Sequence, residues 1–419
     1  MSLDVDYVRK QFPALKQEVK GKKAAFFDAP GGTQVPERVI EAMNNYLIES
    51  NANKGGPFKT SRLSDRKISQ AREALADFLG AAKDEIAFGE NMTTLNYRLA
   101  FALGRELEEG DEVLISRLDH EANRQPWLDL EEQGVKVREI DVDPATCRLR
   151  WQDFLDKLNE KTAVVAVTHA SNAVGTIPPV KKIVEKAEEV GALTVIDAVH
   201  YALHGPVDVK KVGCDFLLCS TYKFFGPHLG VLYGRREAFE KLDTYRLRPQ
   251  SDEVPYRIER GTMNHEGIAG AEATISFIAE LGSKFSSGAG AEYDGASRRR
   301  QNVVAAMELI DEYETPMAEW LSDKLKGLAG VKVYRPPSDT PATSTISFTM
   351  AGITPRQVAE KLGERGLFVW DGDFYATTLI ERLGLSDSGG LVRIGLAPYN
   401  TETEVERLYA AIEEINSGV

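Results

Sequence analysis

The chain has 419 residues, with 51 basic and 64 acidic side chains and a net charge of −13 at neutral pH. This excess of acid argues against nucleic acid as a partner, because binding to a phosphate backbone needs a clustered basic surface. With 42% apolar and 27% charged residues, the composition is that of a globular protein, and the length allows two or three domains.

The sequence has no run of the roughly 18 apolar residues that a membrane-spanning helix needs. Its first 23 residues alternate charges and lack the apolar core of a secretion signal. We therefore expect a cytoplasmic protein without a membrane partner. The three cysteines, Cys147, Cys214 and Cys219, match no metal spacing and are odd in number, so we expect neither a metal site nor a set of disulfides.

Between about residues 84 and 235, short runs of apolar and β-branched residues alternate with helical patterns. The predicted strands cover residues 85–88, 112–115, 135–140, 163–167, 193–196 and 215–219. Segments between them, such as 92–109 and 179–190, carry apolar residues at the three- and four-residue intervals typical of crossover helices. This alternation predicts an α/β fold with a mostly parallel sheet covered by helices on both faces.

Beyond residue 264 the pattern changes to long helices. We predict helices at residues 266–281, 296–328, 355–365 and 402–415, and strands at 331–334 and 345–349, with a loop rich in glycine and serine at 282–295. We interpret this part as a second, smaller α+β domain. The large domain is expected to cover residues 20–265, and the small domain to combine 1–19 with 266–419.

Open α/β sheets bind their ligands beyond the carboxyl ends of the strands, so the residues that follow each strand matter most. Polar residues follow five of the predicted strands, at 89–94, 116–123, 168–172, 197–200 and 220–223. Thr93 and Thr94 begin a predicted helix, where free backbone N–H groups favour an anion such as phosphate. Both threonines would serve equally well as plain helix caps.

Asp197 and Lys223 are the charged candidates at these strand ends. Asp197 follows a wholly apolar strand and needs a cationic or N–H partner, unless it only caps the next helix. A loop lysine is normally solvated. Lys223, however, stands among Tyr222, Phe224 and Phe225, and burial beside aromatic rings lowers a lysine pKa toward the nucleophilic amine form.

His120 and Asn172 add a flat ring and an amide at the same edge of the sheet. A phosphate site, an acid for a ring nitrogen, a stacking group and a buried amine are together what pyridoxal 5'-phosphate requires. Other cofactors fit poorly, because the sequence has no Walker A motif. Its nearest approach to a dinucleotide fingerprint, at Gly288 and Gly290, has Tyr293 in place of the third glycine.

Seven stretches of the chain are similar to one known family, and together they extend over nearly its whole length. They lie at residues 27–33, 119–123, 168–176, 195–200, 220–223, 260–264 and 392–400. The sequence resembles the class V aminotransferase superfamily of fold-type I pyridoxal phosphate enzymes. Within that superfamily it resembles the group that includes cysteine desulfurases and selenocysteine lyases.

The resemblance implies that Lys223 carries the cofactor as a Schiff base, that Asp197 pairs with the pyridinium nitrogen and that His120 stacks on the ring. It also implies that Asn172 and His200 lie near the phenolic oxygen of the cofactor.

For the phosphate, the resemblance implies Thr93, Ser220, Tyr222 and the backbone at Met92, with Thr262 supplied by the partner subunit of a homodimer. Arg393 is implied to bind the substrate carboxylate, a task that suits its planar, bidentate fork.

Four positions depart from the desulfurase pattern. Tyr222 replaces a histidine and Met92 replaces a phosphate-binding threonine; both changes look tolerable, because a hydroxyl and a backbone N–H remain. In the loop at residues 368–376, Tyr375 stands where desulfurases carry the nucleophilic cysteine, and Trp370 stands where they carry an arginine. A phenol cannot accept sulfur as a persulfide in the way that a thiolate does.

We therefore expect a pyridoxal phosphate enzyme, similar to class V aminotransferases, that acts at the α-carbon of a small amino acid. A β-eliminating lyase like the desulfurases, an epimerase and a non-catalytic scaffold are the alternatives, and the last is disfavoured because both Lys223 and Arg393 are retained. Trp370, Phe374 and Tyr375 either shape a substrate pocket or only pack between domains. The identity of the substrate stays open.

Overall fold

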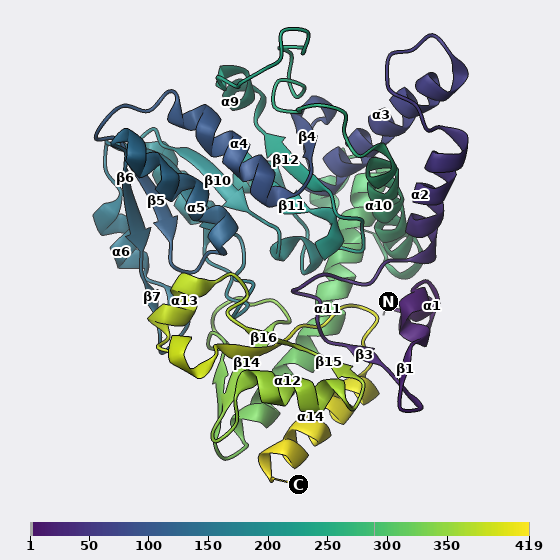
Figure 1. The fold of residues 1–419 in the computed structure, drawn as a ribbon, viewed down its shortest axis with the longest axis vertical. Coiled ribbons are helices and arrows are strands. Elements are labelled where there is room, and N and C mark those ends of the chain that lie inside the picture. The colour runs from purple at the N-terminus through teal and green to yellow at the C-terminus, as the bar shows by residue number, and fades with distance from the viewer. Residues whose placement is uncertain (1–2, 289, 419) are drawn as a thin grey trace.

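Two sheets, one large and one small, organise the chain in the computed structural model, which describes residues 3–288 and 290–418 (Figure 1). The strand order of the large sheet is β4 (Ile86–Gly89), β12 (Gly230–Gly234), β11 (Phe216–Ser220), β10 (Leu193–Asp197), β9 (Thr162–Thr168), β5 (Glu112–Ser116) and β6 (Lys136–Ile140). All six strands predicted for this region are present. The expectation of a mostly parallel sheet is confirmed, since six of these seven strands run in the same direction and only β12 runs opposite to them.

Strand β12 was not predicted from the sequence. Its apolar run is only three residues long and has a glycine at each end, which is a weak strand signal. The glycine at its start has a structural reason, because a Cβ on Gly230 would collide with the backbone of Asn91. This close approach brings β12 against the turn that precedes α4 (Met92–Gly104).

The strands of the large sheet are apolar on both faces because helices cover both faces. In β5, Leu114 contributes to one hydrophobic core, and its neighbours Val113 and Ile115 contribute to the other. The first core also contains α3 (Lys59–Leu79) and α7 (Val180–Glu189), whereas α4 supplies the second. Side chains of a strand alternate between its faces, so an all-apolar strand needs this double cover.

The C-terminal part contains a four-stranded antiparallel sheet, drawn in green and yellow below the large sheet in Figure 1. Its strand order is β13 (Val331–Tyr334), β14 (Ile346–Met350), β17 (Leu391–Ile394) and β16 (Trp370–Gly372). Helices α12 (Pro355–Gly363) and α14 (Glu402–Asn416) contribute to the same core. The predicted strands and helices are all found here, while β16 and β17 were not predicted as strands.

One long helix contributes to both hydrophobic cores. Helix α10 (His265–Phe285) packs against α2 (Glu37–Glu49) and α3 of the large part. Helix α11 (Arg298–Lys326) contributes Val303 to Ile310 to the large core and Met317 to Leu325 to the small core, on either side of Pro316. From this change of core we propose that the small domain begins near Pro316, while the boundary at residue 266 stays a prediction from the sequence.

The N-terminal segment contacts both parts. Val8 and Phe12 belong to the large core, whereas β3 (Ala25–Phe26) pairs in parallel with β15 (Leu367–Phe368). Within the residues that the structure describes, none of the helices combines the length and apolar character needed to cross a lipid bilayer.

Candidate active site

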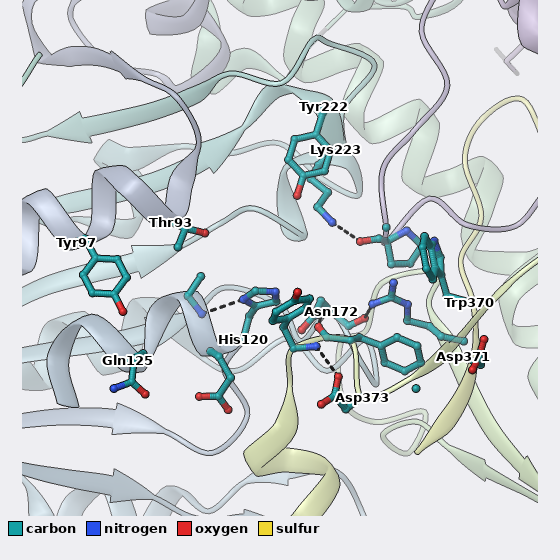
Figure 2. Close-up of a pocket in the computed structure, with 18 residues that line it drawn as sticks. Thr93, Tyr97, His120, Gln125, Asn172, Tyr222, Lys223, Trp370, Asp371 and Asp373 are labelled. Carbon is teal, nitrogen blue, oxygen red and sulfur yellow. Dashed lines mark hydrogen bonds between the residues drawn. The ribbon is translucent and has the colours of Figure 1, made fainter. Parts of the chain in front are cut away.

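The carboxyl ends of the parallel strands border a cavity of about 730 Å³, which the loop at residues 370–375 lines from the other side (Figure 2). A smaller cavity of about 70 Å³ adjoins it. Both cavities are lined by Thr93, His120, Asn172, Tyr222 and Lys223, so we treat them as one site.

Most of the residues singled out from the sequence lie around this site. Those that line one or both cavities are Met92, Thr93, His120, Asn172, Asp197, His200, Ser220, Tyr222, Lys223, Trp370, Tyr375 and Arg393. Thr262 is exposed and does not appear among the described residues that line either cavity. The structure thus brings together every candidate except the one expected to come from a partner subunit.

Lys223 lies in the turn that follows β11, and its Nζ donates a hydrogen bond to the carbonyl of Pro30 (Figure 2). Desolvation and the positive charge of Arg393 lower the pKa of Lys223 to about 7, although Asp197 opposes the shift. A large fraction of this amine is therefore neutral near pH 7, which is the nucleophilic and basic form.

Asp197 is the last residue of β10 and is buried. Its Oδ1 accepts a hydrogen bond from the backbone N–H of Val199 at 2.9 Å, and in the described part of the chain Oδ2 has no hydrogen-bond partner. Desolvation raises the pKa of Asp197 to about 6, while the charge of Lys223 lowers it. A cationic N–H group placed beside Oδ2 would stabilise the carboxylate form.

His120 presents a flat, neutral ring to the cavity. Its Nδ1 accepts a hydrogen bond from the backbone N–H of Ala122 at 3.0 Å, which leaves the proton on Nε2. Desolvation, followed by the charges of Lys223 and Arg393, lowers the pKa of His120 to about 4. The ring of Tyr375 stacks on this imidazole, with ring centroids 5.5 Å apart and an angle of 22° between the planes.

The N-terminus of α4 lines the smaller cavity through Asn91, Met92 and Thr93. Asn91 caps the helix by accepting a hydrogen bond from the N–H of Thr94 at 2.9 Å. The N–H of Met92 donates to Ser220 Oγ at 3.0 Å, which ties the helix start to the end of β11. Together with the hydroxyl of Thr93, this arrangement suits an anion such as phosphate.

Arg393 lies on β17 with its side chain buried. It donates a hydrogen bond to the carbonyl of Asn172 at 2.9 Å, and its guanidinium lies over the ring of Phe374, 4.1 Å from the centroid. Burial lowers the pKa of Arg393 to about 9, and the charge of Asp28 opposes this shift. Arg393 is therefore cationic at neutral pH and held in one plane, ready for a carboxylate.

The loop at residues 370–375 has a strained backbone that neighbours hold in place. Phe374 and Tyr375 adopt φ angles of 58° and 55°, in the left-handed region that side chains disfavour. The carbonyl of Phe374 accepts from the side chain of Asn172 at 2.9 Å, and that of Tyr375 accepts from the N–H of Glu121 at 2.7 Å. The carboxylate of Asp373 accepts from the N–H of Tyr375 at 3.0 Å.

Sequence reasoning gave no role to Asp28 and Pro30, although both lie in a stretch that resembled the family. Asp28 forms a bridge with Gly395, two residues from Arg393, and Pro30 accepts the hydrogen bond from Lys223. The only local signal was the run of Pro30 and two glycines, which indicates a tight turn.

All three cysteines are buried, and none is among the described residues that line the two cavities. Desolvation raises the pKa of Cys147 to about 12, and it also raises the pKa values of Cys214 and Cys219. Their thiols therefore stay protonated at neutral pH.

Comparison with known proteins agrees with this architecture. A cysteine desulfurase structure from Thermococcus onnurineus NA1 superposes with a TM-score of 0.86 at 29% identity and covers 100% of this chain and 99% of that one. The fold-type I architecture expected from the sequence is confirmed by this neighbour.

Proteins of similar sequence include one named as aminotransferase-like and others named as cysteine desulfurases. The aminotransferase-like protein FGM3 of Gibberella zeae is 32% identical over 99% of both chains. A cysteine desulfurase of Synechococcus elongatus is 30% identical over 100% of this chain, and a probable cysteine desulfurase of Mycolicibacterium paratuberculosis is 31% identical over 99%. This chain spans only 64% and 58% of the lengths of those two desulfurases.

A match to the aminotransferase class-V family extends over residues 25–293 and 303–408, which is most of the chain. The match, the superposition and the relatives all cover the strands that border the cavity. The protein belongs to the aminotransferase class-V family.

Proposed function

We propose that this protein is a pyridoxal phosphate enzyme that acts at the α-carbon of a small amino acid, with Lys223 as the residue that carries the cofactor. The observation that supports this most is the amine of Lys223, whose pKa is lowered to about 7 in a cavity that also contains Asp197 and Arg393. A structural lysine needs no such environment, whereas a catalytic amine does.

The residues of the site fit pyridoxal phosphate. The free oxygen of Asp197 suits a protonated ring nitrogen, and the flat face of His120 suits the ring. The phosphate would be held at the N-terminus of α4 by the residues at this end of the site, namely Met92, Thr93, Ser220 and Tyr222. When bound, the cofactor supplies an electron-withdrawing ring that stabilises negative charge at the α-carbon of an amino acid.

The chain's own residues then have distinct tasks. Arg393, held flat by Phe374 and by the carbonyl of Asn172, binds the carboxylate of the substrate and so orients the α-carbon. Lys223, with a pKa of about 7, takes the α-proton as a neutral amine and returns it as an ammonium group. Asn172 and His200 are proposed to contact the phenolic oxygen of the cofactor.

Between the reactions open to such a site, we favour transfer of the amino group. Tyr375 stands in the loop position where the desulfurase resemblance requires a thiol, and the three cysteine thiols are buried away from both cavities. A lyase that expels selenium or sulfinate without help from a thiol is the second candidate, supported by the relatives named cysteine desulfurases. An epimerase would use the same residues.

We further infer a cytoplasmic homodimer in which Thr262 reaches the phosphate of the partner subunit. Its exposure in the single chain is what such a role requires. A scaffold without turnover is a weaker proposal, because it would need neither the amine of Lys223 nor the guanidinium of Arg393.

The experiment that tests the proposed function offers the purified, cofactor-loaded protein each of the amino acids, with and without a 2-oxo acid as amino acceptor. Mass spectrometry of the products distinguishes transfer, which yields a new 2-oxo acid, from elimination, which releases the side-chain group. Lys223→Ala is the matched control and should abolish either reaction. Absence of any product with every amino acid, while the cofactor stays bound, would contradict the proposed function.

A further inference from the structure

A buried histidine and a buried glutamate meet at the junction of the two domains. His204 Nδ1 lies 3.0 Å from Glu314 Oε2, and the two residues are 4% and 1% exposed. The same Oε2 accepts a hydrogen bond from the hydroxyl of Ser344 at 2.9 Å. An ionised Glu314 can only accept at Oε2, and with that charge state His204 would donate the proton on its Nδ1.

Ser344 belongs to a three-residue segment that leads into β14. On either side of it, the hydroxyls of Thr345 and Thr343 lie 2.9 Å and 3.1 Å from Nε2 of His200. The central residue of the segment therefore contacts the Glu314 and His204 pair, and its two neighbours contact His200. Ser344 is joined covalently to both threonines, so its hydrogen bond to Glu314 helps to place them.

His200 lines the smaller cavity together with Asp197 and Lys223. Its ring meets that of His204 edge to face, with centroids 4.9 Å apart and 62° between the planes. Desolvation, then the charges of His204, Lys223 and Arg393, hold the pKa of His200 well below its usual range. His200 is therefore neutral, and one of its nitrogens donates while the other accepts.

The direction of the hydrogen bond at Nε2 decides which ring nitrogen of His200 carries the proton. If Nε2 accepts from a threonine hydroxyl, Nδ1 carries the proton and is a donor; if Nε2 donates, Nδ1 is an acceptor. The threonine hydroxyls can do either. The segment that carries them is held at three points: Arg335 donates to the carbonyls of Thr343 and Thr345, both at 2.6 Å, the N–H of Thr343 donates to the carbonyl of Gly175 at 2.9 Å, and Ser344 donates to Glu314. The bond to Glu314 is the one of these that also involves His204.

We propose that Glu314 and His204 are positioning residues that hold the 343–345 segment and, through it, the ring and tautomer of His200 at the site. The consequence for catalysis rests on the proposed function. The hydrogen-bonded residues come from both parts of the fold. His200 and His204 belong to the large part, and Thr343 to Thr345 lead into β14 of the small sheet. Glu314 lies on α11 next to Tyr313, which packs against both cores.

The test uses protein labelled with ¹⁵N at its six histidines, whose Nδ1–H and Nε2–H tautomers have distinct ¹⁵N shifts. Glu314→Met removes the acceptor while keeping the side-chain length, and Ser344→Ala removes only the link to the segment. Glu314→Gln keeps an acceptor oxygen and serves as the conservative rescue. Glu112→Gln is the matched control, because Glu112 is equally buried but bonds to Arg138 and Asn159 at the opposite end of the sheet.

We expect Glu314→Met and Ser344→Ala to shift the His200 signals or split them into two tautomers, while Glu314→Gln and Glu112→Gln leave them in place. In cofactor-loaded protein, the first two variants should move the visible absorbance maximum. They should also lower kcat by about 10- to 100-fold with little change in KM, as happens when outer partners of metal-bound histidines are removed.

Unchanged His200 signals in both Glu314→Met and Ser344→Ala, with only a fall in thermal stability like that of Glu112→Gln, would overturn the proposal. If Glu314→Met does not fold, Ser344→Ala decides alone. Failure of the wild-type protein to bind pyridoxal phosphate would contradict the proposed function, but the tautomer of His200 in cofactor-free protein would still decide the role of Glu314 and His204.

Discussion

The amine of Lys223 takes its character from three sources: the loss of solvent around it, the cation of Arg393 and the anion of Asp197. The first two disfavour the ammonium form and the third favours it. In the described structure the amine donates its hydrogen bond to the carbonyl of Pro30 and not to either charged side chain. Arg393 and Asp197 can therefore be replaced one at a time to change the pKa of Lys223.

Trace acetylation of the cofactor-free protein should label Lys223 with a half-maximal rate at pH about 7, because acetic anhydride reacts only with the neutral amine. Arg393→Ala should move this midpoint to higher pH by removing a nearby cation, and Asp197→Asn should move it to lower pH by removing an anion. Peptide mapping by mass spectrometry gives the midpoint for each lysine. A lysine in a model peptide, with a pKa near 10.4, serves as the reference.

The cysteine residues lead to a second prediction at the same scale. Supplied with L-cysteine, the protein should accumulate no protein-bound persulfide, because the three thiols are buried and desolvation raises the pKa of Cys147 to about 12. Alkylation followed by mass spectrometry, with and without a reducing thiol, detects the adduct. A persulfide that forms on Cys147, Cys214 or Cys219 during turnover would restore desulfuration as the leading function.

At the scale of elements, the loop that carries Tyr375 depends on a few hydrogen bonds for its shape. Two consecutive residues with φ near +55° are costly for side chains other than glycine, on the order of 1 kcal/mol each. Asp373 compensates by accepting from the N–H of Tyr375 and from the hydroxyl of Thr377, at 3.0 Å and 2.8 Å. The position of Phe374 under Arg393 follows from this geometry.

Asp373→Ala should therefore raise KM for the amino acid severalfold while lowering the stability by less than about 1 kcal/mol, since the loop is at the surface. Tyr375→Gly should preserve the backbone, because glycine adopts φ near +55° without strain, and should change KM less. Steady-state kinetics and thermal melting separate the two effects. Asp387→Ala, on an exposed turn of the same domain, is the control, and an equal rise in KM there would count against this account.

At the scale of the whole molecule, two large apolar side chains are exposed at the end of α2. Helix α2 exposes Leu47 and Ile48, which are 48% and 80% accessible. Lys54, just beyond this helix, lines the same surface hollow as Gly261 and Met263, the neighbours of Thr262. We propose that Leu47 and Ile48, together with the surface around Thr262, belong to the interface of the proposed dimer.

Light scattering should therefore give twice the mass of one chain. Ile48→Glu should produce monomers that lose the cofactor, because a buried charge without a partner is costly at an interface and the monomer lacks the threonine from its partner. Trp320→Glu, which alters an exposed aromatic residue on α11, should leave the mass unchanged. A stable monomer that retains the cofactor would disprove the obligate dimer.

Local sequence patterns were sufficient to find the candidate site residues at the ends of the parallel strands. Asp197, Lys223 and His120 were located because a buried parallel strand is an unbroken apolar run, and the sheet brings its carboxyl ends to one edge. Strand β12 was not predicted, because three apolar residues between two glycines are too short a run to indicate a strand. Arg393 came from family resemblance, since a buried arginine on a short strand has no local signature of its own.

The hydrogen bonds around the site join residues far apart in the chain, so only the tertiary structure reveals them. Pro30 and Lys223 are 193 positions apart in the chain, and Glu314 and His204 are 110 apart, so no periodicity relates them. The sequence of α11 also does not show where the helix passes from one hydrophobic core to the other. The helical period is the same on both sides of Pro316, while the packing partners change. A sequence pattern records which face of an element is apolar, but only the packed fold determines what lies against that face, and hence which charges share a desolvated cavity.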